Sequence, residues 1–371
     1  MRLRVERDVL ADAVAWAARS LPARPTVPVL AGLLLEAAGH QLTLSGFDYE
    51  VSAQVGVDVT AAEGGRVLVS GRLLAEITRS LPAQPVELAT DGSRLVLTCG
   101  TARFTLPTLP VEDYPALPEM PAGAGSLESD VFAAAVAQVA IAAGRDDTLP
   151  VLTGVRLEID GEKLTLAATD RYRLAVRELP WKPGQTGLTA TALVPSRTLA
   201  DTAKTLTTGA EVSLALATGS AGDGMIGFEG GGRRTTTRLL DGEFPKYRAL
   251  FPAEAVSTAL VSTGAFVDAV KRVALVAARN TPIRLSFAGT EVVLEAGGGD
   301  EAAASEALEA GFEGEPLTVA FNPMYLLDGL VAIDSDVARL SFTTPTKPTV
   351  ITGKDVGGDY RYLLMPVRLS G

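Results

Sequence analysis

The sequence predicts an α+β fold in which one domain is repeated three times, each copy carrying two helices on antiparallel sheets. The first observation is a long internal repeat: PVLAGLLLE at residues 28–36 returns as PVLTGVRLE at residues 150–158, an offset of 122 residues. The second is a more degraded third copy that begins near Ser262. The third is the order of patterns in each copy, which runs helix, strands, helix, strands. Because solenoid and propeller repeats span about 20–50 residues, a repeat this long is a whole domain.

The length of the chain agrees with three domains. At 371 residues it is long for a single core, since a domain has about 150 residues as a prior. Two stretches rich in proline and glycine, residues 118–125 and 251–255, are typical of linkers. We therefore expect an N-terminal domain at residues 1–121, a middle domain at 126–251 and a C-terminal domain at 256–371.

The first helix of each copy is predicted by apolar side chains that recur at helical spacing. These helices are expected over residues 7–19, 130–143 and 265–278. Ser129 and Thr263 precede two of them and are expected to be N-caps. The side chains expected to face the core are Val9, Leu10, Ala13, Trp16 and Ala17, then Phe132, Val136 and Val139, then Phe266, Val270, Val273 and Ala277.

The second helix of each copy is expected over residues 71–81, 195–206 and 323–332. Asn322 followed by Pro323 is a good start signal, because asparagine caps helix N-termini and proline fits the first helical position. The segments around these helices alternate apolar and polar residues, which predicts strands. Examples are QLTLSG, KLTLAAT, RLVLTCG, RTTTRLL and EVVLEAG.

Basic residues recur on the outer faces of the expected helices. Arg72 and Arg79 are seven residues apart, as are Arg197 and Lys204, so each pair shares one helix face. A solvated helix face is one explanation, and the acidic residues between the cations agree with it. Recurrence at equivalent places of the repeat favours a shared function. The first pair is expected to point away from the apolar residues Leu73, Leu74, Ile77 and Leu81.

Composition limits the class of protein. Hydrophobic residues make up 47% and charged residues 21%, which is typical of globular proteins. No apolar run reaches the ~18 residues of a membrane span, and the start lacks the apolar core of a signal peptide, so we expect a cytoplasmic protein without membrane contact. One cysteine, Cys99, fits a reducing compartment. The net charge of −11 argues against binding nucleic acid with the whole surface, so the positions of the cations matter more than their sum.

No motif in the sequence carries catalytic chemistry. A single histidine, His40, lies in a turn-like segment and excludes multi-histidine metal sites. Residues 222–227 satisfy GxGxxG, but a strand pattern follows where a dinucleotide site requires a helix, so a loop and hairpin are expected rather than a nucleotide-binding enzyme. The acidic pairs at 112–113 and 146–147 have no third carboxylate at useful spacing. We therefore expect no catalytic residue, no metal and no cofactor.

Two segments have surface-type sequences that folding alone does not explain. ATDRYRLAV, at residues 168–176, places Arg171, Tyr172 and Arg173 between two strand-like pieces. The end of the chain, YLLMPVRLSG, is apolar where chain ends are usually polar and loose. Either this tail is a docked last strand, or it forms part of a groove that binds a partner.

The whole chain resembles one family, the bacterial DNA sliding clamps, which are the β subunits of DNA polymerase III. The motifs that carry the resemblance are RPTVPVLAGLLLE, LPVLTGVRLE, ATDRYRLAV, RLLDGEFPKYRALFP and the terminal YLLMPVRL, in this order. The resemblance implies a head-to-tail homodimer of three-domain chains, a closed ring of six similar domains with helices lining the hole. Such a ring holds double-stranded DNA topologically and without sequence preference, so mild attraction to phosphates suffices.

The resemblance implies a replication processivity factor without enzymatic activity. It would tether the replicative DNA polymerase, the clamp loader and repair proteins through short peptide motifs of these partners. The alternative is a duplicate clamp paralogue with an altered pocket. Many relatives have a Gly-His pair in place of Arg171 and Tyr172, so the bulkier pair here is expected to narrow or recharge one end of the pocket.

The resemblance also assigns site residues by position. The DNA-facing residues would be Arg24, Arg72, Arg79, Arg145, Arg197, Lys204 and Arg279. The peptide pocket would be formed by Leu152, Thr169, Arg171, Tyr172, Arg173, Leu174, Pro245, Leu250, Pro348, Leu363, Met365, Pro366 and Arg368. At the dimer interface, Arg103, Phe104 and Leu106 of one chain would meet Leu275, Val276 and the acidic stretch near Asp300 and Glu301 of the other.

Overall fold

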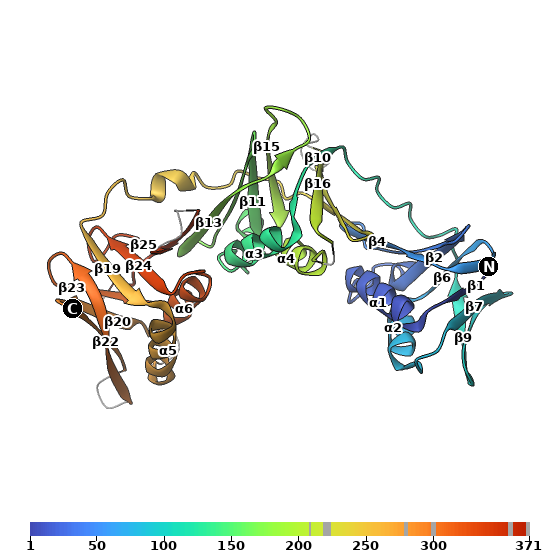
Figure 1. Ribbon diagram of the computed structural model, residues 1–371, viewed down its shortest axis with the longest axis horizontal. Helices are drawn as coiled ribbons and strands as arrows, with labels where there is room; N and C mark the ends of the chain where they lie inside the picture. The colour runs from blue at the N-terminus through green and yellow to red at the C-terminus, as the bar shows by residue number, and fades with distance from the viewer. Residues whose placement is uncertain (208, 218–223, 278–280, 298–301, 355–358, 369–371) are drawn as a thin grey trace. The chain divides into compact units, whose positions relative to one another are not determined.

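The computed structural model describes residues 1–371 apart from 208, 218–223, 278–280, 298–301, 355–358 and 369–371. The chain divides into two compact units. Unit 1 contains residues 1–133, 182–185 and 201–239, and unit 2 contains residues 134–181, 186–200 and 240–371. Each unit is built on one continuous antiparallel sheet, as the α+β prediction requires (Figure 1).

The sheet of unit 1 combines the strands of the first copy with strands of the middle copy. Its alternating burial follows the strand period of two: β8 buries Leu95, Leu97 and Cys99 and turns the residues between them outward. In spatial order the strands are β14 (Lys182–Pro183), β10 (Gly123–Glu128), β16 (Glu211–Ala217), β17 (Met225–Gly230), β18 (Arg233–Arg238), β4 (Val51–Asp58), β3 (Gln41–Phe47), β2 (Gly32–Ala38), β6 (Gly65–Ser70), β9 (Ala102–Leu109), β8 (Arg94–Cys99), β7 (Val86–Asp91), β1 (Arg2–Val5) and β5 (Thr60–Glu63).

The sheet of unit 2 combines the remaining strands of the middle copy with those of the last copy. In spatial order they are β15 (Thr189–Pro195), β11 (Gly154–Asp160), β12 (Lys163–Thr169), β13 (Arg173–Pro180), β26 (Tyr360–Leu364), β25 (Thr349–Gly353), β24 (Val337–Phe342), β19 (Ser257–Ser262), β22 (Ala303–Glu313), β21 (Glu291–Gly297), β20 (Ile283–Ala288) and β23 (Leu317–Phe321). The apolar C-terminal segment is therefore a docked strand, the first of the two alternatives for the tail.

The helices pack in pairs. In unit 1, α1 (Arg7–Ala17) packs beside α2 (Gly71–Ser80), and in unit 2, α5 (Thr263–Val273) packs beside α6 (Pro323–Val331) (Figure 1). The residues of α3 (Ser129–Ala140) and α4 (Ser196–Thr205) are shared between the two units. The repeated PVLA and PVLT segments form equivalent 3₁₀ turns, η2 (Pro28–Ala31) and η3 (Pro150–Thr153). A further 3₁₀ turn, η4 (Tyr247–Leu250), immediately precedes the second linker.

The helices lie where the sequence predicts them, with corrections at their ends. The first helix of each copy ends earlier than expected, at Ala17, Ala140 and Val273, because 3₁₀ turns replace the last α-helical turn after the first and third of them. Ser129 and Thr263 are the first residues of their helices and not N-caps. The prediction for Asn322 is confirmed, since its side chain accepts hydrogen bonds from the next helical N–H groups.

The buried stripes of α1 and α2 are narrower than expected. Val9 is 42% exposed and Leu73 is 43% exposed, so their predicted burial is wrong. Each lies one position before a buried leucine, and only residues three or four apart share one face of a helix. Ala277 is only half-buried, because the turn η5 (Ala274–Val276) breaks the helical spacing after Val273.

The glycine-rich segment after β16 forms a hairpin where it is described. Gly222 and Asp223 lie outside the described residues, and from Met225 the chain is the strand β17. The turn to β18 is made by Gly231 and Gly232, which have φ angles of 59° and 76° that favour glycine. The prediction of a hairpin after this GxGxxG sequence is therefore confirmed.

Two strand junctions join neighbouring copies of the repeat. In unit 1, β18 of the middle copy pairs with β4 of the first copy, with Thr236 opposite Ser52. In unit 2, β26 of the last copy pairs with β13 of the middle copy, with Leu363 opposite Leu174. These junctions explain why the compact units divide the middle copy: each of its two sheets continues into a neighbour. The domain boundaries expected from the sequence stay predictions.

Candidate functional site

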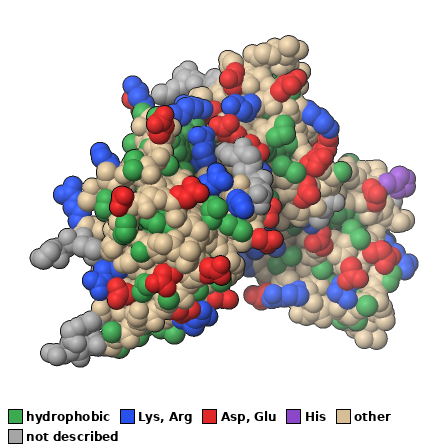
Figure 2. Space-filling model, turned by 60° about the vertical axis from the view of Figure 1, so that its left-hand side comes forward, with side chains coloured by type: hydrophobic (Ala, Val, Ile, Leu, Met, Phe, Trp, Pro, Cys, Tyr) green, Lys and Arg blue, Asp and Glu red, His purple; other side chains and the backbone are tan. Residues whose placement is uncertain are grey.

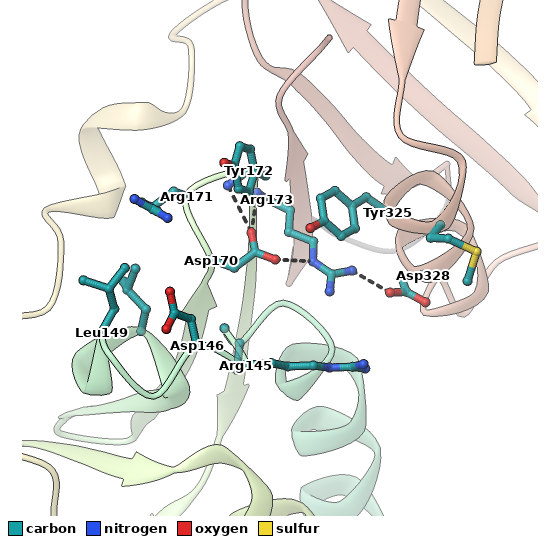
Figure 3. Close-up of a pocket in the computed structure, with 13 residues that line it drawn as sticks. Arg145, Asp146, Leu149, Asp170, Arg171, Tyr172, Arg173, Tyr325 and Asp328 are labelled. Carbon is teal, nitrogen blue, oxygen red and sulfur yellow. Dashed lines mark hydrogen bonds and ion pairs between the residues drawn. The ribbon is translucent and has the colours of Figure 1, made fainter. Parts of the chain in front are cut away.

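The main candidate site is a cavity of about 570 Å³ in unit 2 (Figure 3). Three segments that are distant in sequence form it: the loop that follows α3, the turn between β12 and β13, and the beginning of α6. Its lining residues are Ala143, Gly144, Arg145, Asp146, Leu149, Leu152, Asp170, Arg171, Tyr172, Arg173, Met324, Tyr325 and Asp328. The cavity thus combines side chains of the middle and last copies.

The turn from Asp170 to Arg173 is fixed by side chain to backbone hydrogen bonds. One carboxylate oxygen of Asp170 accepts from the N–H groups of Tyr172 at 3.0 Å and Arg173 at 3.1 Å. The Thr169 hydroxyl donates to the Arg173 carbonyl at 2.7 Å and accepts from the Arg171 N–H at 3.3 Å. These bonds hold Arg171 at a φ of 79°, a left-handed conformation that is uncommon outside glycine. The turn therefore presents Arg171 and Tyr172 on the surface.

Arg173 is the buried anchor of the site. Its side chain is 6% exposed and forms ion pairs with Asp170 at 2.9 Å and with Asp328 of α6 at 2.5 Å. Its guanidinium lies 4.3 Å from the centre of the Tyr325 ring, at cation–π distance. Burial alone would lower the pKa of Arg173, but Tyr362, Asp328 and Asp170 raise it, so the group stays charged. The anchor binds the turn of the middle copy to the helix of the last copy.

The loop on the opposite side of the cavity is ordered by Asp146. Its carboxylate accepts from the Thr148 hydroxyl at 2.6 Å and from the Thr148 N–H at 3.0 Å. These two hydrogen bonds lower the pKa of Asp146, and the nearby charge of Arg171 adds to this effect. The loop holds Leu149 at the surface, 36% exposed. An apolar side chain therefore lies across the cavity from the Arg171 turn (Figure 3).

The residues expected to form a peptide pocket fall into four groups. Leu152, Arg171, Tyr172 and Arg173 line the cavity. The others lie outside this lining: Leu174 and Leu363 belong to the buried core cluster with Phe244 and Tyr247, Thr169 supports the turn, and Pro245, Leu250, Pro348, Met365, Pro366 and Arg368 lie just before the second linker and beside the last strands.

The tail nevertheless continues beside the cavity. The Met365 N–H donates to the Tyr172 carbonyl at 2.9 Å, and the Val367 N–H donates to the Ala320 carbonyl at 2.8 Å. Pro348 immediately precedes Thr349, which is paired with Leu364. The tail is therefore a docked strand that also borders the turn which forms one wall of the cavity.

Three lining residues on α6 were missed by sequence reasoning. Met324 is 61% exposed, Tyr325 stacks on Tyr172 with ring centres 6.3 Å apart, and Asp328 binds Arg173. An available signal was the Asn322-Pro323 start, which fixes the beginning of the helix and places Met324 in its first, exposed turn. That α6 meets the Arg173 turn is decided by tertiary packing.

The segment just before the second linker is tied to the sheet of unit 2 by Glu158. Its carboxylate accepts hydrogen bonds from Arg156 at 2.6 Å, from Tyr247 at 3.1 Å and from Arg248. Burial would raise the pKa of Glu158, but its bonds to Arg248 and Arg156 outweigh this and lower the pKa. The ion cluster therefore fixes the segment that carries Leu250, which is 49% exposed.

The cations expected to face DNA are exposed side chains where they are described. Six of the seven, Arg24, Arg72, Arg79, Arg145, Arg197 and Lys204, are exposed and have no carboxylate within ion-pair distance among the described residues. Arg279 lies outside the described residues. Figure 2 shows basic and acidic side chains interspersed over the face that it presents.

The residues expected at a dimer interface lie on or near two strand edges. Arg103 of β9 is exposed and Phe104 is half-buried, but Leu106 is 1% exposed, so its side chain is part of the core of unit 1 and this part of the prediction is corrected. In unit 2, Leu275 is 84% exposed and Val276 is half-buried. The acidic stretch at 300–301 lies outside the described residues.

The described part of the chain contains no group of three or more His, Cys, Asp or Glu side chains that could hold a metal ion. No described helix has the length and apolar character to cross a membrane.

Comparisons with known proteins give one family. Models of the N-terminal, central and C-terminal domains of the DNA polymerase III beta subunit match residues 1–118, 126–246 and 248–368. The chain is 64% identical to the beta sliding clamp of Streptomyces coelicolor, over 100% of both chains. It is 47% identical to the beta sliding clamp homolog GriR of Streptomyces muensis, over 99% of each. The solved structure of the DNA polymerase sliding clamp from Bacillus subtilis matches with a TM-score of 0.92 at 26% identity, over 100% of both chains.

Proposed function

This chain belongs to the bacterial DNA polymerase III β-subunit family, and we propose that it works as a ring-shaped homodimer around duplex DNA. It is a DNA sliding clamp, a non-catalytic processivity factor of replication. Its three clamp domains are built from antiparallel sheets and helices. A factor that acts on the replicating chromosome belongs in the cytoplasm.

The repeated strand junction is the observation that supports the ring. Inside the chain, the fourth strand of one copy pairs with the last strand of the next copy, as β4 does with β18 and β13 with β26. In the remaining copies, the fourth strand is β22 and the last strand is β9. Among the described residues, residues 303–309 of β22 pair only with β21, and residues 102–107 of β9 pair only with β8. Two chains arranged head to tail would pair β22 with β9 of the partner subunit and close the series.

The two junctions also give the register of the proposed third. Val55, Arg177 and Glu306 lie opposite the equivalent leucine on the third strand of each copy, which is β3, β12 or β21. Val55 pairs with Arg233 and Arg177 pairs with Tyr360. Ala102 follows its hairpin turn as Arg233 does, so Glu306 is expected opposite Ala102 of the partner subunit.

Cross-linking tests this register. The paired substitutions Ala102→Cys and Glu306→Cys are expected to give a covalent dimer on mild oxidation, because the two positions would face each other across the third junction. Moving one cysteine to Arg94, on the neighbouring strand, supplies a control that should not cross-link. A monomer at micromolar concentration would exclude the ring.

We propose that the cations Arg24, Arg72, Arg79, Arg145, Arg197, Lys204 and Arg279 face the DNA. Their attraction to phosphates needs no base contact, and weak binding suits a ring that must slide. Retention on closed circular DNA that is lost when the circle is cut is the expected result, and equal retention on linear DNA would contradict it. Arg24→Glu is expected to slow loading onto DNA without changing peptide binding, and unaltered loading would remove Arg24 from this set.

We propose that the cavity and the adjoining apolar surface bind short peptide segments of the polymerase, the clamp loader and repair proteins. The support is chemical: exposed apolar side chains surround a few fixed polar groups, as in peptide-binding pockets. Met365→Ala combined with Pro366→Ala should weaken peptide binding and leave the dimer intact. Unchanged peptide affinity would remove the pocket assignment.

A duplicate clamp with an altered pocket remains the second candidate, since the homolog GriR covers nearly the whole chain at 47% identity. The standard clamp is favoured by the 64% identity to the beta sliding clamp of Streptomyces coelicolor. Deletion of the gene separates the two, because loss of the main clamp stops replication whereas loss of a duplicate does not.

A further inference from the structure

We propose that the sheet of unit 1 carries a further protein-binding site, which takes an extended partner segment whose side chains alternate in charge as acid, base, acid. The site is a hollow of about 720 Å³ over the strands β1, β7, β8 and β9 (Figure 1). Its lining residues are Arg2, Leu3, Arg4, Thr60, Glu87, Leu88, Ala89, Thr90, Asp91, Val96, Thr98 and Arg103. All of them belong to unit 1, whereas the cavity described above belongs to unit 2.

Strand pairing places four polar side chains of the hollow in one row. Arg4 of β1 lies opposite Glu87 of β7. Glu87 lies opposite Thr98 of β8, which lies opposite Arg103 of β9. Their neighbours along the strands, such as Leu97, are buried on the other face, because side chains alternate along a strand. The row therefore presents a cation, an anion, a hydroxyl and a second cation on the exposed face of the sheet.

The charges of this row are available to a ligand. In the described part of the chain, no carboxylate lies within ion-pair distance of Arg2, Arg4 or Arg103, and no cation lies within that distance of Glu87. Arg4 and Glu87 are neighbours across two strands, yet they do not form an ion pair. A bound segment with complementary charges would supply the partners that the chain itself does not.

The proposed dimer would leave the charge of Arg103 available. With Glu306 opposite Ala102 of the other chain, the same register places Arg103 opposite Ser305 of the partner subunit. Glu306 points to the other face, where it binds Arg272 in its own chain. This register gives Arg103 an uncharged neighbour in place of the acidic stretch near residues 300–301.

The spacing of the row defines the ligand. Neighbouring strands are about 4.8 Å apart, so Arg4 and Arg103, three strand spacings apart, are separated by about 14 Å. An extended peptide advances about 3.3 Å per residue, so its residues i and i+4 lie about 13 Å apart on one face. Acidic side chains at these two positions would reach both arginines. Residue i+2 would lie over Glu87 and Thr98, which favour a lysine or arginine there.

Other anions fit the row less well. A single phosphate or carboxylate cannot contact Arg4 and Arg103 together at this separation. A nucleic acid strand has a negative charge at every nucleotide, so its phosphates would also lie against Glu87 and Asp91 and be repelled. Complementary alternation of charge, by contrast, gives each side chain of the row an opposite partner.

Arg2 strengthens the end of the hollow at β1. It lies two residues before Arg4, on the same face of the strand. The strand is paired along both edges, with β7 and with β5, so the backbone under the two arginines is fixed before a ligand binds. A fixed backbone lowers the entropic cost of binding. The acid at this end of the segment should therefore contribute more affinity than the acid at Arg103.

Labelled nine-residue peptides test the pattern by fluorescence anisotropy at low salt. TVETKTEVT carries two acids and a central lysine on β-branched spacers, which favour an extended conformation. It should bind the native protein about five-fold more tightly than TVETETEVT, although the second peptide is more negative. TVTEKETVT has the same composition with its acids only two residues apart, and it should also bind about five-fold more weakly. Both ratios should decrease as salt increases.

The decisive variant is Glu87→Lys, which reverses the charge in the middle of the row. It should invert the preference, so that TVETETEVT binds more tightly than TVETKTEVT, and Glu87→Gln should abolish the preference. Glu315→Lys makes the same charge change in an exposed loop of unit 2 and is the matched control that keeps the native preference. Arg2→Ser combined with Arg4→Ser should weaken TVETKTEVT about ten-fold, and Arg103→Ser about five-fold.

The outcomes decide between this site and general attraction to charge. If the native protein prefers the more negative peptide, or if Glu87→Lys keeps the native preference, the proposal is wrong. Failure of TVETKTEVT to bind, or unchanged binding in the arginine variants, would overturn it as well. None of these results bears on the peptide pocket proposed in unit 2, because the two sites share no residue.

Discussion

The junction of β4 with β18 and the junction of β13 with β26 have the same backbone pairing but opposite distributions of side-chain bulk. In the first, the residues that lie opposite one another on three neighbouring strands are Phe47 of β3, Ser52 of β4 and Thr236 of β18. In the second, the equivalent row consists of Thr169 of β12, Leu174 of β13 and Leu363 of β26. Large and small residues have exchanged places, so the same backbone carries two different surfaces.

At the first junction the aromatic ring fills the space. Phe47 packs with Val29, Leu34, Leu68 and Tyr114 and is 7% exposed. Beyond it, Ser52 and Thr236 form a buried hydroxyl pair at 2.6 Å. The next position in the row is Gly227, and Met120 of the first linker packs so closely over it that a Cβ there would lie 2.3 Å from the sulfur. These contacts pack the side chains of the first junction tightly.

At the second junction the large side chains lie on the two paired strands instead. Leu174 and Leu363 form a buried core with Phe244 and Tyr247, and the position equivalent to Phe47 is the small Thr169, whose hydroxyl supports the neighbouring turn. The difference teaches that the repeat supplies the same backbone pairing at both junctions. A few side chains determine what packs against it.

The two junctions also differ in their buried arginine, and Arg173→Met should have the largest effect. At the second junction it removes the partner of Asp170 and Asp328, with an expected cost of about 3–5 kcal/mol in the free energy of unfolding. At the first junction Arg233 binds Asp12, which is 71% exposed and can return to water, so Arg233→Met should cost about 1–2 kcal/mol. Chemical denaturation of both variants gives the comparison, and equal costs would contradict it.

Phe47→Thr gives the first junction the residue of the second. The lost burial and the cavity left behind should lower the stability of unit 1 by about 3 kcal/mol, because the surrounding core cannot fully collapse. Hydrogen exchange of the β3 and β4 amides measures the effect. Peptide binding at the second junction should not change. A cost below about 1 kcal/mol would show that Phe47 does not fill this part of the core.

The hydroxyl pair of the first junction should respond non-additively. Ser52→Ala or Thr236→Val alone should cost about 1–2 kcal/mol, because each leaves one buried hydroxyl without its partner. The double variant should cost less than the two single changes together. Denaturation of the four proteins as a double-mutant cycle measures the coupling, and simple additivity would exclude the pair.

The segments that precede the two linkers should differ in their response to acid. The first is held by Tyr114, an apolar contact whose burial raises the pKa of its hydroxyl to about 12, so it does not titrate near neutrality. The second is held by Glu158, whose pKa is lowered in the folded chain. Its stabilising contribution of about 1 kcal/mol is therefore present at neutral pH and lost as the pH falls below about 4. Glu158→Gln should remove this acid dependence, which limited proteolysis of the two linkers can follow.

Much of the fold could be predicted because its signals are local. Helical spacing identified α1 to α6, and Asn322 identified the start of α6. The errors also have local causes: Val9 and Leu73 are apolar but lie beside the buried stripe. The candidate site was predicted in part through Leu152 and the Arg171 to Arg173 segment, whereas Tyr325 and Asp328 were missed. No periodicity records that their helix packs against this turn.

The sequence by itself determined the three copies, their helices and strands, and the polar turn that follows β12, since each depends on residues within a few positions of one another. The tertiary structure alone decided which side chains meet at each junction. Ser52 and Thr236 are 184 residues apart, and Leu174 is still farther in sequence from its opposite residue, Leu363. Only the register of paired strands brings such residues opposite one another. The packing at each junction is therefore a property of the assembled sheet.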